Sequence, residues 1–533
     1  MAPQTGTTYA YLRPERPPGR RRRLLWLLAA ILVPVVVAGG VIWAQRTEGT
    51  AEQTADRYLA AWSSQDYATM RALTADPPTG FEARHKRFLA GLKAEEATFR
   101  RSVSGGPFAD NGPDDDGYLF FQARLTGARD WDYTGRLRLV ERDRTWKVAW
   151  TPATLHPLLT TADRSLRLVT EKGDPLKVLA ADGTPVNTPD APGSVQQLVE
   201  GVKQTHPDLF ATFGNARIDL YRGDQVVTTV VPAQRREPLK TTLDLAVHRA
   251  GAAALEKVTK PASLVALRSS TGEILAVVNK PGGFNRALLG TYPPGSTFKV
   301  VTASALVADG VSPQQRVTCP AEKNIGGFPF HNAGFKDYGT LTFQEAFAHS
   351  CNTTFGEMSV ASLGGGRLGE VAAAFGFGVP IRPGVPAVRA EFPAPKDDTD
   401  LASASIGQGR VLASPLNMAS VAAAIASGAW IPPRILAGGP GDPPRPLEPG
   451  VVAALRRLMP AVVTDGTAAA VRFPSGTAGK TGTAEYGSGA EPPAHSWFIG
   501  YKGDVAFAVL VEGGGAGSAV AAPAAARFLA ALP

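Results

Sequence analysis

A long apolar run lies near the start of the chain. No residue from Leu24 to Ala44 carries a charge, and a helix of this length matches a hydrocarbon layer of about 30 Å. Arginines are dense before the run and sparser after it, and positive residues favour the cytoplasmic side. We therefore expect a cytoplasmic arm over 1–23, a single-pass transmembrane helix over 24–44 and an extracytoplasmic remainder. A cleaved signal peptide is the alternative, with a small-residue site at Val36-Val37-Ala38.

The segment after this run changes from helical to strand periodicity. Apolar residues first recur at helical spacing, at Ala55, Tyr58, Leu59 and Trp62. Farther on they alternate with polar residues, as in strands with one buried face, at Leu137, Leu139, Trp146, Val148 and Trp150. A helix followed by antiparallel strands predicts an α+β domain over residues 50–157.

The middle of the chain carries weaker patterns. Residues 218–221 and 226–231 are apolar-rich segments on either side of a short polar turn, which predicts a hairpin. We interpret residues 158–238 as a small α+β linker domain.

The last part of the chain, residues 239–533, predicts one larger α+β domain. It begins with a helix that starts at residues 241–244 and runs through Val247 and Ala254. A hairpin follows, then alanine-rich helical stretches and finally three strand-like segments. A mainly antiparallel sheet covered by helices is the simplest architecture for this order. The strand segments are 264–268, 274–278, 480–485, 497–501 and 505–511.

Charge excludes one class of partner. The net charge is +8 over 533 residues, but six arginines and one glutamate place +5 within residues 1–23. No stripe of interleaved basic and aromatic residues supports nucleic-acid binding. The 7 histidines show no metal-ligand spacing, so we expect neither a metal nor a cofactor. Between Cys319 and Cys351 a bridge is possible without being predicted, and Cys351 is otherwise interpreted as a small buried residue.

Three short motifs carry the candidate chemistry. They are Ser296-Thr-Phe-Lys299, Ser350-Cys-Asn352 and Lys480-Thr-Gly482-Thr483. Three residues apart on a helix, Ser296 and Lys299 share one face, and a neutral lysine can take the proton of a serine nucleophile. A serine helix cap beside a surface lysine would explain the first motif alone, but it would not explain the other two.

The order of the motifs resembles the signature of the penicillin-recognising serine acyltransferases. The flanking sequences Tyr292-Pro-Pro-Gly295, Ile406-Gly-Gln-Gly409 and His495-Ser-Trp-Phe498 are similar to the transpeptidase domain of class B penicillin-binding proteins. Residues 50–157 resemble the nuclear-transport-factor-like (NTF2-like) N-terminal domain of the methicillin-resistance type. The small segment 158–238 stands where that family has a larger dimerisation domain.

The resemblance implies a catalytic role for three residues. Ser296 would be the acylated nucleophile and Lys299 its general base. Ser350 would relay the proton to the leaving D-alanine and bridge Lys299 and Lys480 through its hydroxyl.

The same resemblance implies a substrate-binding role for five residues. Asn352 would hold the donor peptide with its amide, and Lys480 would dock the terminal carboxylate. Thr481 and Thr483 would add hydroxyl donors, and Gly482 would let the substrate lie close to the strand. The backbone N–H groups of Ser296 and Thr483 would form the oxyanion hole.

The implied function is a membrane-anchored D,D-transpeptidase that acts on peptidoglycan stem peptides and is acylated by β-lactams. No glycosyltransferase motif of the form Glu-Asp-x-x-Phe is present, so a separate glycosyltransferase is the expected partner. A D,D-carboxypeptidase or a serine β-lactamase remains an alternative, although no Glu-x-x-Leu-Asn follows Ser350. A non-enzymatic β-lactam sensor or scaffold is the third.

Overall fold

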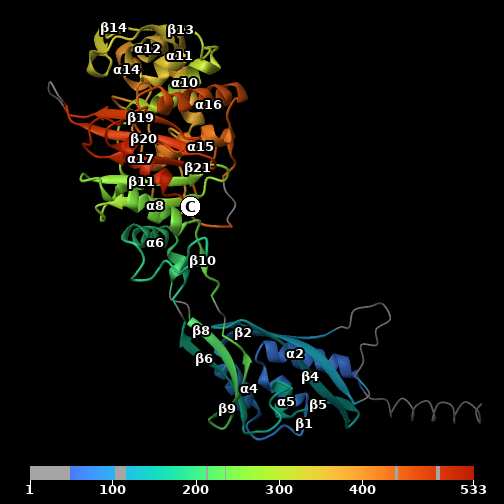
Figure 1. Ribbon diagram of the computed structural model, residues 1–533. Coiled ribbons are helices and arrows are strands. Elements are labelled where there is room, and N and C mark those ends of the chain that lie inside the picture. Colours follow the sequence, from blue (N-terminus) through green and yellow to red (C-terminus); the bar gives the residue numbers. More distant parts are fainter. Residues whose placement is uncertain are drawn as a thin grey trace, which may run out of the picture. The chain divides into compact units, whose positions relative to one another are not determined.

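The computed structural model describes residues 48–102, 114, 116–173, 175–211, 214–233, 236–438, 442–487 and 492–533. They form two compact units, one of residues up to 173 with 213–235, the other of 174–212 with 236–533 (Figure 1). The arm predicted at 1–23 and the transmembrane helix predicted at 24–44 lie outside the described residues. Within the described ranges, no helix combines the length and apolarity that crossing a bilayer requires.

The N-terminal unit packs helices against a five-stranded sheet of order β1-β5-β4-β3-β2. Only the pair β1 and β5 is parallel. The helices are α2 (Ala51–Ser63), α3 (Tyr67–Ala72), α4 (Phe81–Gly91) and α5 (Pro152–Leu155). The strands are β1 (Thr74–Ala75), β2 (Ala94–Arg101), β3 (Tyr118–Gly127), β4 (Trp131–Arg142) and β5 (Thr145–Ala149).

Trp62 lies at the centre of this unit's core. Its ring stacks on Phe99 with centroids 3.8 Å apart and meets Phe121 edge-on at 5.8 Å. The predicted helical face is confirmed, because the four residues that define it are at most 1% exposed. Leu137 and Leu139 face the same core from β4, as their alternation with arginines predicted.

Residues 158–238, expected to form a separate linker domain, instead divide between the two units. The sheet β6-β8-β9 buries Leu166 and Ile218 in the N-terminal core. Residues Val178 and Leu198 join the core of the C-terminal unit. The apolar residues of its two parts face different neighbours, so each part buries them against the larger unit beside it. Its elements are β6 (Arg164–Lys172), β7 (Val178–Leu179), α6 (Gly193–Thr205), α7 (Pro207–Phe210), β8 (Gly214–Arg222) and β9 (Gln225–Val231).

The C-terminal unit contains the predicted antiparallel sheet, with strand order β12-β11-β21-β20-β19. Helices cover both of its faces (Figure 1), and most strand residues are accordingly buried whichever way they point. The strands are β11 (Ala262–Arg268), β12 (Ile274–Lys280), β19 (Ala478–Glu485), β20 (Ala494–Lys502) and β21 (Val505–Val511). The covering helices are α8 (Leu245–Glu256), α15 (Pro415–Ser427), α16 (Pro449–Thr464) and α17 (Ala521–Ala530).

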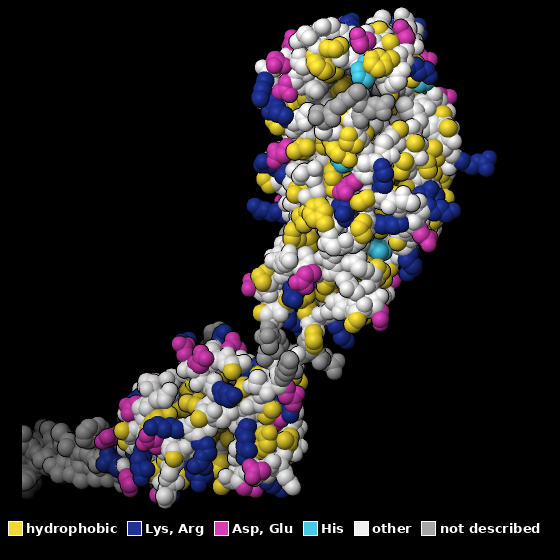
Figure 2. Space-filling model, turned by 90° about the vertical axis from the view of Figure 1, so that its left-hand side faces the viewer, with side chains coloured by type: hydrophobic (Ala, Val, Ile, Leu, Met, Phe, Trp, Pro, Cys, Tyr) yellow, Lys and Arg dark blue, Asp and Glu magenta, His cyan; other side chains and the backbone are white. Residues whose placement is uncertain are grey.

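A lobe of short helices and hairpins lies next to the sheet (Figure 1), and its 3₁₀ turn η1 (Gly295–Phe298) contacts strands β19 and β20. Its other helical elements are α10 (Lys299–Ala308), η2 (Ala333–Phe335), α11 (Phe343–Ala348), α12 (Asn352–Met358), α13 (Gly364–Ala374) and α14 (Asp398–Ser405). Its strands are β13 (Arg316–Cys319), β14 (Glu322–Ile325), β15 (Phe328–His331) and β16 (Gly339–Thr342). On the face in Figure 2, basic and acidic side chains are interspersed on both units.

The packing of Trp62 predicts the stability of the N-terminal unit. The change Trp62→Ala should lower its free energy of unfolding by about 3–5 kcal/mol, because it leaves a large cavity among aromatic rings. Phe120→Ala is the control, since this side chain on β3 is 47% exposed and its loss should cost no more than about 0.5 kcal/mol. Calorimetry of the full chain would resolve the transition; an unchanged transition in Trp62→Ala would contradict this account of the core.

Candidate active site

The loop before Ser296 is fixed by backbone and indole hydrogen bonds. The N–H of Gly295 donates to the carbonyl of Gly407 at 2.8 Å, and the Trp497 Nε1 donates to the carbonyl of Pro293 at 3.0 Å. Gly295 has φ 53°, a conformation that glycine adopts without strain. A Cβ on Gly295 would lie 2.6 Å from the Thr483 carbonyl oxygen. The loop therefore presents Ser296 directly beside strand β19.

Lys299 is the centre of the candidate site. Its Nζ lies 3.1 Å from Ser296 Oγ, 2.7 Å from the Ser350 carbonyl, 3.3 Å from Ser350 Oγ and 2.6 Å from Asn352 Oδ1. The side chain is fully buried, and burial, with a smaller contribution from the charge of Lys480, lowers the pKa of Lys299 well below its usual value. The structure thus brings together the four residues that the first two motifs were expected to contribute.

The arrangement of acceptors matches a neutral amine at Lys299. A neutral amine has two N–H groups and one lone pair. The Ser350 carbonyl and Asn352 Oδ1 can only accept, so they take the two N–H groups at the two shortest distances. The lone pair is then left for the hydroxyl of Ser296, which is the geometry that a general base needs.

The second motif lies on a strained turn between α11 and α12. Ser350 has φ 60°, an uncommon conformation for a residue with a side chain and a recurrent one at functional sites. The backbone N–H of Asn352 donates to Asn332 Oδ1 at 2.8 Å, and its Nδ2 donates to the His331 carbonyl at 3.0 Å. Both ends of the Asn352 amide are therefore used inside the protein, and here they position Lys299. The sequence did not suggest this role, nor the part of Asn332.

A disulfide joins the second motif to strand β13. Cys351, between Ser350 and Asn352, is bonded to Cys319. The sequence had left this pairing open. Neighbouring hydroxyls strengthen the connection, since Thr354 Oγ1 donates to the Thr318 carbonyl at 2.7 Å. The strained turn is thus attached covalently to a strand of the lobe.

Lys480 extends from β19 into the same buried region. It is fully buried, forms no ion pair with any described residue, and donates to the Thr481 carbonyl at 3.2 Å. The expected hydroxyl bridge from Ser350 is therefore formed to Lys299 and not to Lys480. Burial lowers the pKa of Lys480 to about 7. A buried cation without an anionic partner can be satisfied by an incoming carboxylate.

The other residues of the third motif connect β19 to its surroundings. The Thr481 hydroxyl lies 2.6 Å from that of Thr467, whose N–H donates to the Ala348 carbonyl at 3.0 Å. Sequence reasoning missed Thr467, which belongs to no motif. The exposed Thr483 accepts the Gly517 N–H through its Oγ1 at 3.2 Å.

Close packing explains why position 482 is glycine, and the sequence did not reveal this reason. A Cβ here would lie 2.8 Å from Thr297 Cγ2 and 2.9 Å from the Pro294 carbonyl oxygen. Because these atoms belong to the loop and turn around Ser296, the close packing of β19 against them already requires glycine. Access for a substrate was the predicted reason.

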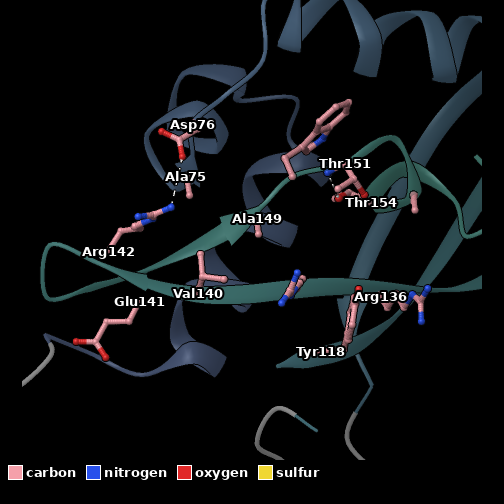
Figure 3. Close-up of a pocket in the computed structure, with 13 residues that line it drawn as sticks. Ala75, Asp76, Tyr118, Arg136, Val140, Glu141, Arg142, Ala149, Thr151 and Thr154 are labelled. Atoms are coloured by element: carbon pink, nitrogen blue, oxygen red, sulfur yellow. Dashed lines mark hydrogen bonds and ion pairs between the residues drawn. The ribbon is translucent and has the colours of Figure 1, made fainter. Parts of the chain in front are cut away.

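A separate groove of about 570 Å³ lies on the N-terminal unit (Figure 3). Arg142 faces Asp76 at 3.8 Å, and the Arg136 guanidinium lies over the Tyr118 ring at 4.6 Å. The groove lining contains no histidine, cysteine or lysine, so it lacks an acid–base pair like that of the serine site. Across the described ranges, no group of His, Cys, Asp and Glu could hold a metal ion.

Comparison with known proteins gives two family matches. Residues 262–530 match the penicillin binding protein transpeptidase domain, and residues 50–163 match the NTF2-like N-terminal transpeptidase domain. The first match covers half of the chain and includes every residue of the three motifs. The second covers the N-terminal unit's α2 through β5.

Individual relatives support the match to the transpeptidase family. The chain is 35% identical over 326 residues to the peptidoglycan D,D-transpeptidase PbpA of Mycolicibacterium smegmatis, covering 49% of this chain and 65% of that protein. It is 32% identical over 352 residues to PbpA of Mycobacterium tuberculosis, covering 53% and 70%. The structure of penicillin-binding protein A from M. tuberculosis as a penicillin G acyl-enzyme matches with a TM-score of 0.51 at 30% identity, covering 56% of this chain and 81% of that one.

The titration of Lys480 predicts how reaction with a penicillin depends on pH. Lys480 must be charged to bind the carboxylate, and its pKa is about 7, so the second-order acylation rate constant should fall as pH rises through this value. Lys299 must be neutral, and its lowered pKa should give the rising limb on the acid side. Stopped-flow measurement with a fluorescent penicillin would record both limbs.

A penicillin methyl ester is the control for this profile. It lacks the carboxylate, so it should react more slowly and without the alkaline decline. An identical decline for the acid and the ester would show that Lys480 does not bind the carboxylate.

The disulfide predicts a redox effect on the same reaction. The double variant Cys319→Ser/Cys351→Ser should react about 10-fold more slowly with penicillin, equivalent to about 1.4 kcal/mol, because the Ser350 turn would lose its covalent restraint. Treatment of the unmodified protein with a reductant should give the same loss. Far-ultraviolet circular dichroism should stay unchanged; full reactivity after verified reduction would contradict the positioning role.

Proposed function

The chain belongs to the penicillin-binding protein transpeptidases, as a class B member with an NTF2-like N-terminal domain, and we propose that it cross-links peptidoglycan stem peptides through an acyl-enzyme on Ser296. One observation carries the proposal. Lys299 is buried and has no carboxylate partner among the described residues. With its two N–H groups already bonded, the lone pair of its amine faces Ser296 Oγ. This is the geometry of a serine nucleophile activated by a neutral lysine.

The acylation step uses the first two motifs. Lys299 takes the proton from Ser296 as Oγ attacks the carbonyl carbon of the penultimate D-alanine. The backbone N–H groups of Ser296 and Thr483 would stabilise the oxyanion, each worth about 2.7–4 kcal/mol. As the C–N bond breaks, the proton passes from Lys299 through the Ser350 hydroxyl, 3.3 Å away, to the leaving amine of D-alanine.

Transfer of the acyl group completes the reaction. The amine of a neighbouring stem attacks the ester carbonyl, loses a proton to Lys299 and forms the new amide, while Ser296 recovers its proton. The terminal carboxylate of the donor would lie at Lys480, between the hydroxyls of Thr481 and Thr483. A β-lactam would enter by the same attack on its ring carbonyl and remain attached as a penicilloyl ester.

The proposal also covers where the protein is located and which enzyme it needs as a partner. The apolar run at 24–44 supports a single membrane anchor with the catalytic unit outside the cell membrane, where stem peptides are found. The absence of a glycosyltransferase motif from the sequence supports polymerisation of the glycan by a separate enzyme.

The decisive experiment supplies both possible acyl acceptors, the amine of a neighbouring stem peptide and water. The full-length protein would be mixed with a glycan polymerase and lipid-linked precursor, and the muropeptides would be separated by mass. Cross-linked dimers should dominate and should disappear in Ser296→Ala, which removes the nucleophile. Ser304→Ala is the matched control on α10, because among the described residues this buried serine donates only to the Val300 carbonyl, at 2.8 Å.

Other products would assign other functions. Shortened but uncross-linked stems would identify a D,D-carboxypeptidase. Rapid release and destruction of penicillin would identify a β-lactamase. Absence of any covalent penicillin adduct on the wild type would leave a non-enzymatic scaffold.

A further inference from the structure

An exposed strip of rings lies beside the acylation site. Phe335 is 59% exposed, and its ring stacks on that of His331 with centroids 4.3 Å apart and an interplanar angle of 16°. Pro329 is also exposed and lies two residues before His331 on β15, so it shares the same face of the strand. The three rings form what we call the ring strip, namely Pro329, His331 and Phe335.

The ring strip is attached to the catalytic residues. The His331 carbonyl accepts from Asn352 Nδ2 at 3.0 Å, and Asn352 Oδ1 holds Lys299 at 2.6 Å. Asn332 fixes the following turn, since its Nδ2 donates to the Lys336 carbonyl at 3.0 Å. The strip is thus held by Asn352, which also accepts a hydrogen bond from Lys299, and by Asn332, which binds the backbone of Asn352.

The conformation of Phe335 is costly for the fold. Its φ of 53° is an outlier for a bulky residue, and such strain costs about 1–3 kcal/mol. Exposing most of a phenylalanine also forgoes the gain from its burial. Neither cost is offset by core packing, and backbone outliers of this kind recur at ligand-binding sites.

Polar side chains lie along one edge of the strip. On β14, Glu322 is paired with His331, and Asn324 is paired with Pro329. Directly paired residues project on the same side of a hairpin, and both of these are exposed. Flat rings flanked by a carboxylate and an amide suit a sugar, whose C–H face packs on rings while its hydroxyls form hydrogen bonds.

We propose that the ring strip is a binding subsite for an amino-sugar ring of the glycan strand that carries the stem peptide. This inference rests on the proposed function. An extended stem of about five residues spans roughly 17 Å, so the sugar must be recognised at some distance from the bond that breaks. The strip is connected to Ser296 through hydrogen bonds of Lys299, Asn352 and His331, so it lies near the acylation site but is separate from it.

The test compares substrates with and without sugar. In the full-length protein, Phe335→Ala should reduce kcat/KM for glycan-linked substrate about 5- to 10-fold, as expected for loss of one ring contact. It should leave acylation by penicillin and by a synthetic stem peptide unchanged. Phe335→Tyr should restore the glycan-linked reaction, because it keeps the ring.

Phe328→Ala is the matched control. This phenylalanine is 54% exposed but lies on the other face of β15, where it meets Phe330 at 5.3 Å. Its loss should affect none of the three substrates. An equal loss for penicillin in Phe335→Ala would show that the residue only supports Asn352, and no loss for any substrate would also overturn the proposal.

A binding measurement separates this inference from the proposed function. Glycan strands stripped of their stem peptides should bind the wild type in a sedimentation assay and bind Phe335→Ala several-fold more weakly. This assay needs no acyl transfer, so it can succeed even if the enzyme proves hydrolytic. Equal binding by the two proteins would contradict the subsite while leaving the chemistry at Ser296 untouched.

Discussion

The site depends on keeping the amine of Lys299 neutral in a place where water cannot reach it. Burial favours the neutral form by lowering the pKa of Lys299, and two acceptors that cannot donate, the Ser350 carbonyl and Asn352 Oδ1, take its N–H groups. The orientation of the lone pair then follows from geometry. The strained Ser350 turn, the Asn332 anchor and the bridge at Cys351 all serve to hold those two acceptors in place.

Sequence patterns predicted the helices and strands whose apolar residues repeat at a regular spacing. Helix α2 and strands β4 and β5 follow from the spacing of Trp62, Leu137 and Val148, because a half-buried element must repeat its apolar residues at its own period. The encounter of Ser296 with Lys299 follows from their spacing on one helical face. The assignment of the three motifs to one site followed from resemblance, and the structure places their residues around Lys299 and strand β19.

The features that the sequence did not reveal depend on contacts between residues that lie far apart along the chain. Thr467 and His331 act through a hydroxyl and a backbone carbonyl, and neither belongs to a recognisable motif. The segment 158–238 was interpreted as one domain, yet the apolar faces of its sheet and of helix α6 enter different cores. The pairing of Cys319 with Cys351 depends on β13 meeting the α11–α12 turn, a contact that sequence spacing does not encode.

The packing of Gly482 limits how this site can change over evolutionary time. Any larger residue would collide with Thr297 and Pro294 before it reached a ligand, so it would displace the nucleophile together with the inhibitor. Escape from a β-lactam by reshaping this point of β19 would therefore damage the native reaction as well. Variation that spares catalysis must arise in loops that do not support Ser296 or contact the substrate.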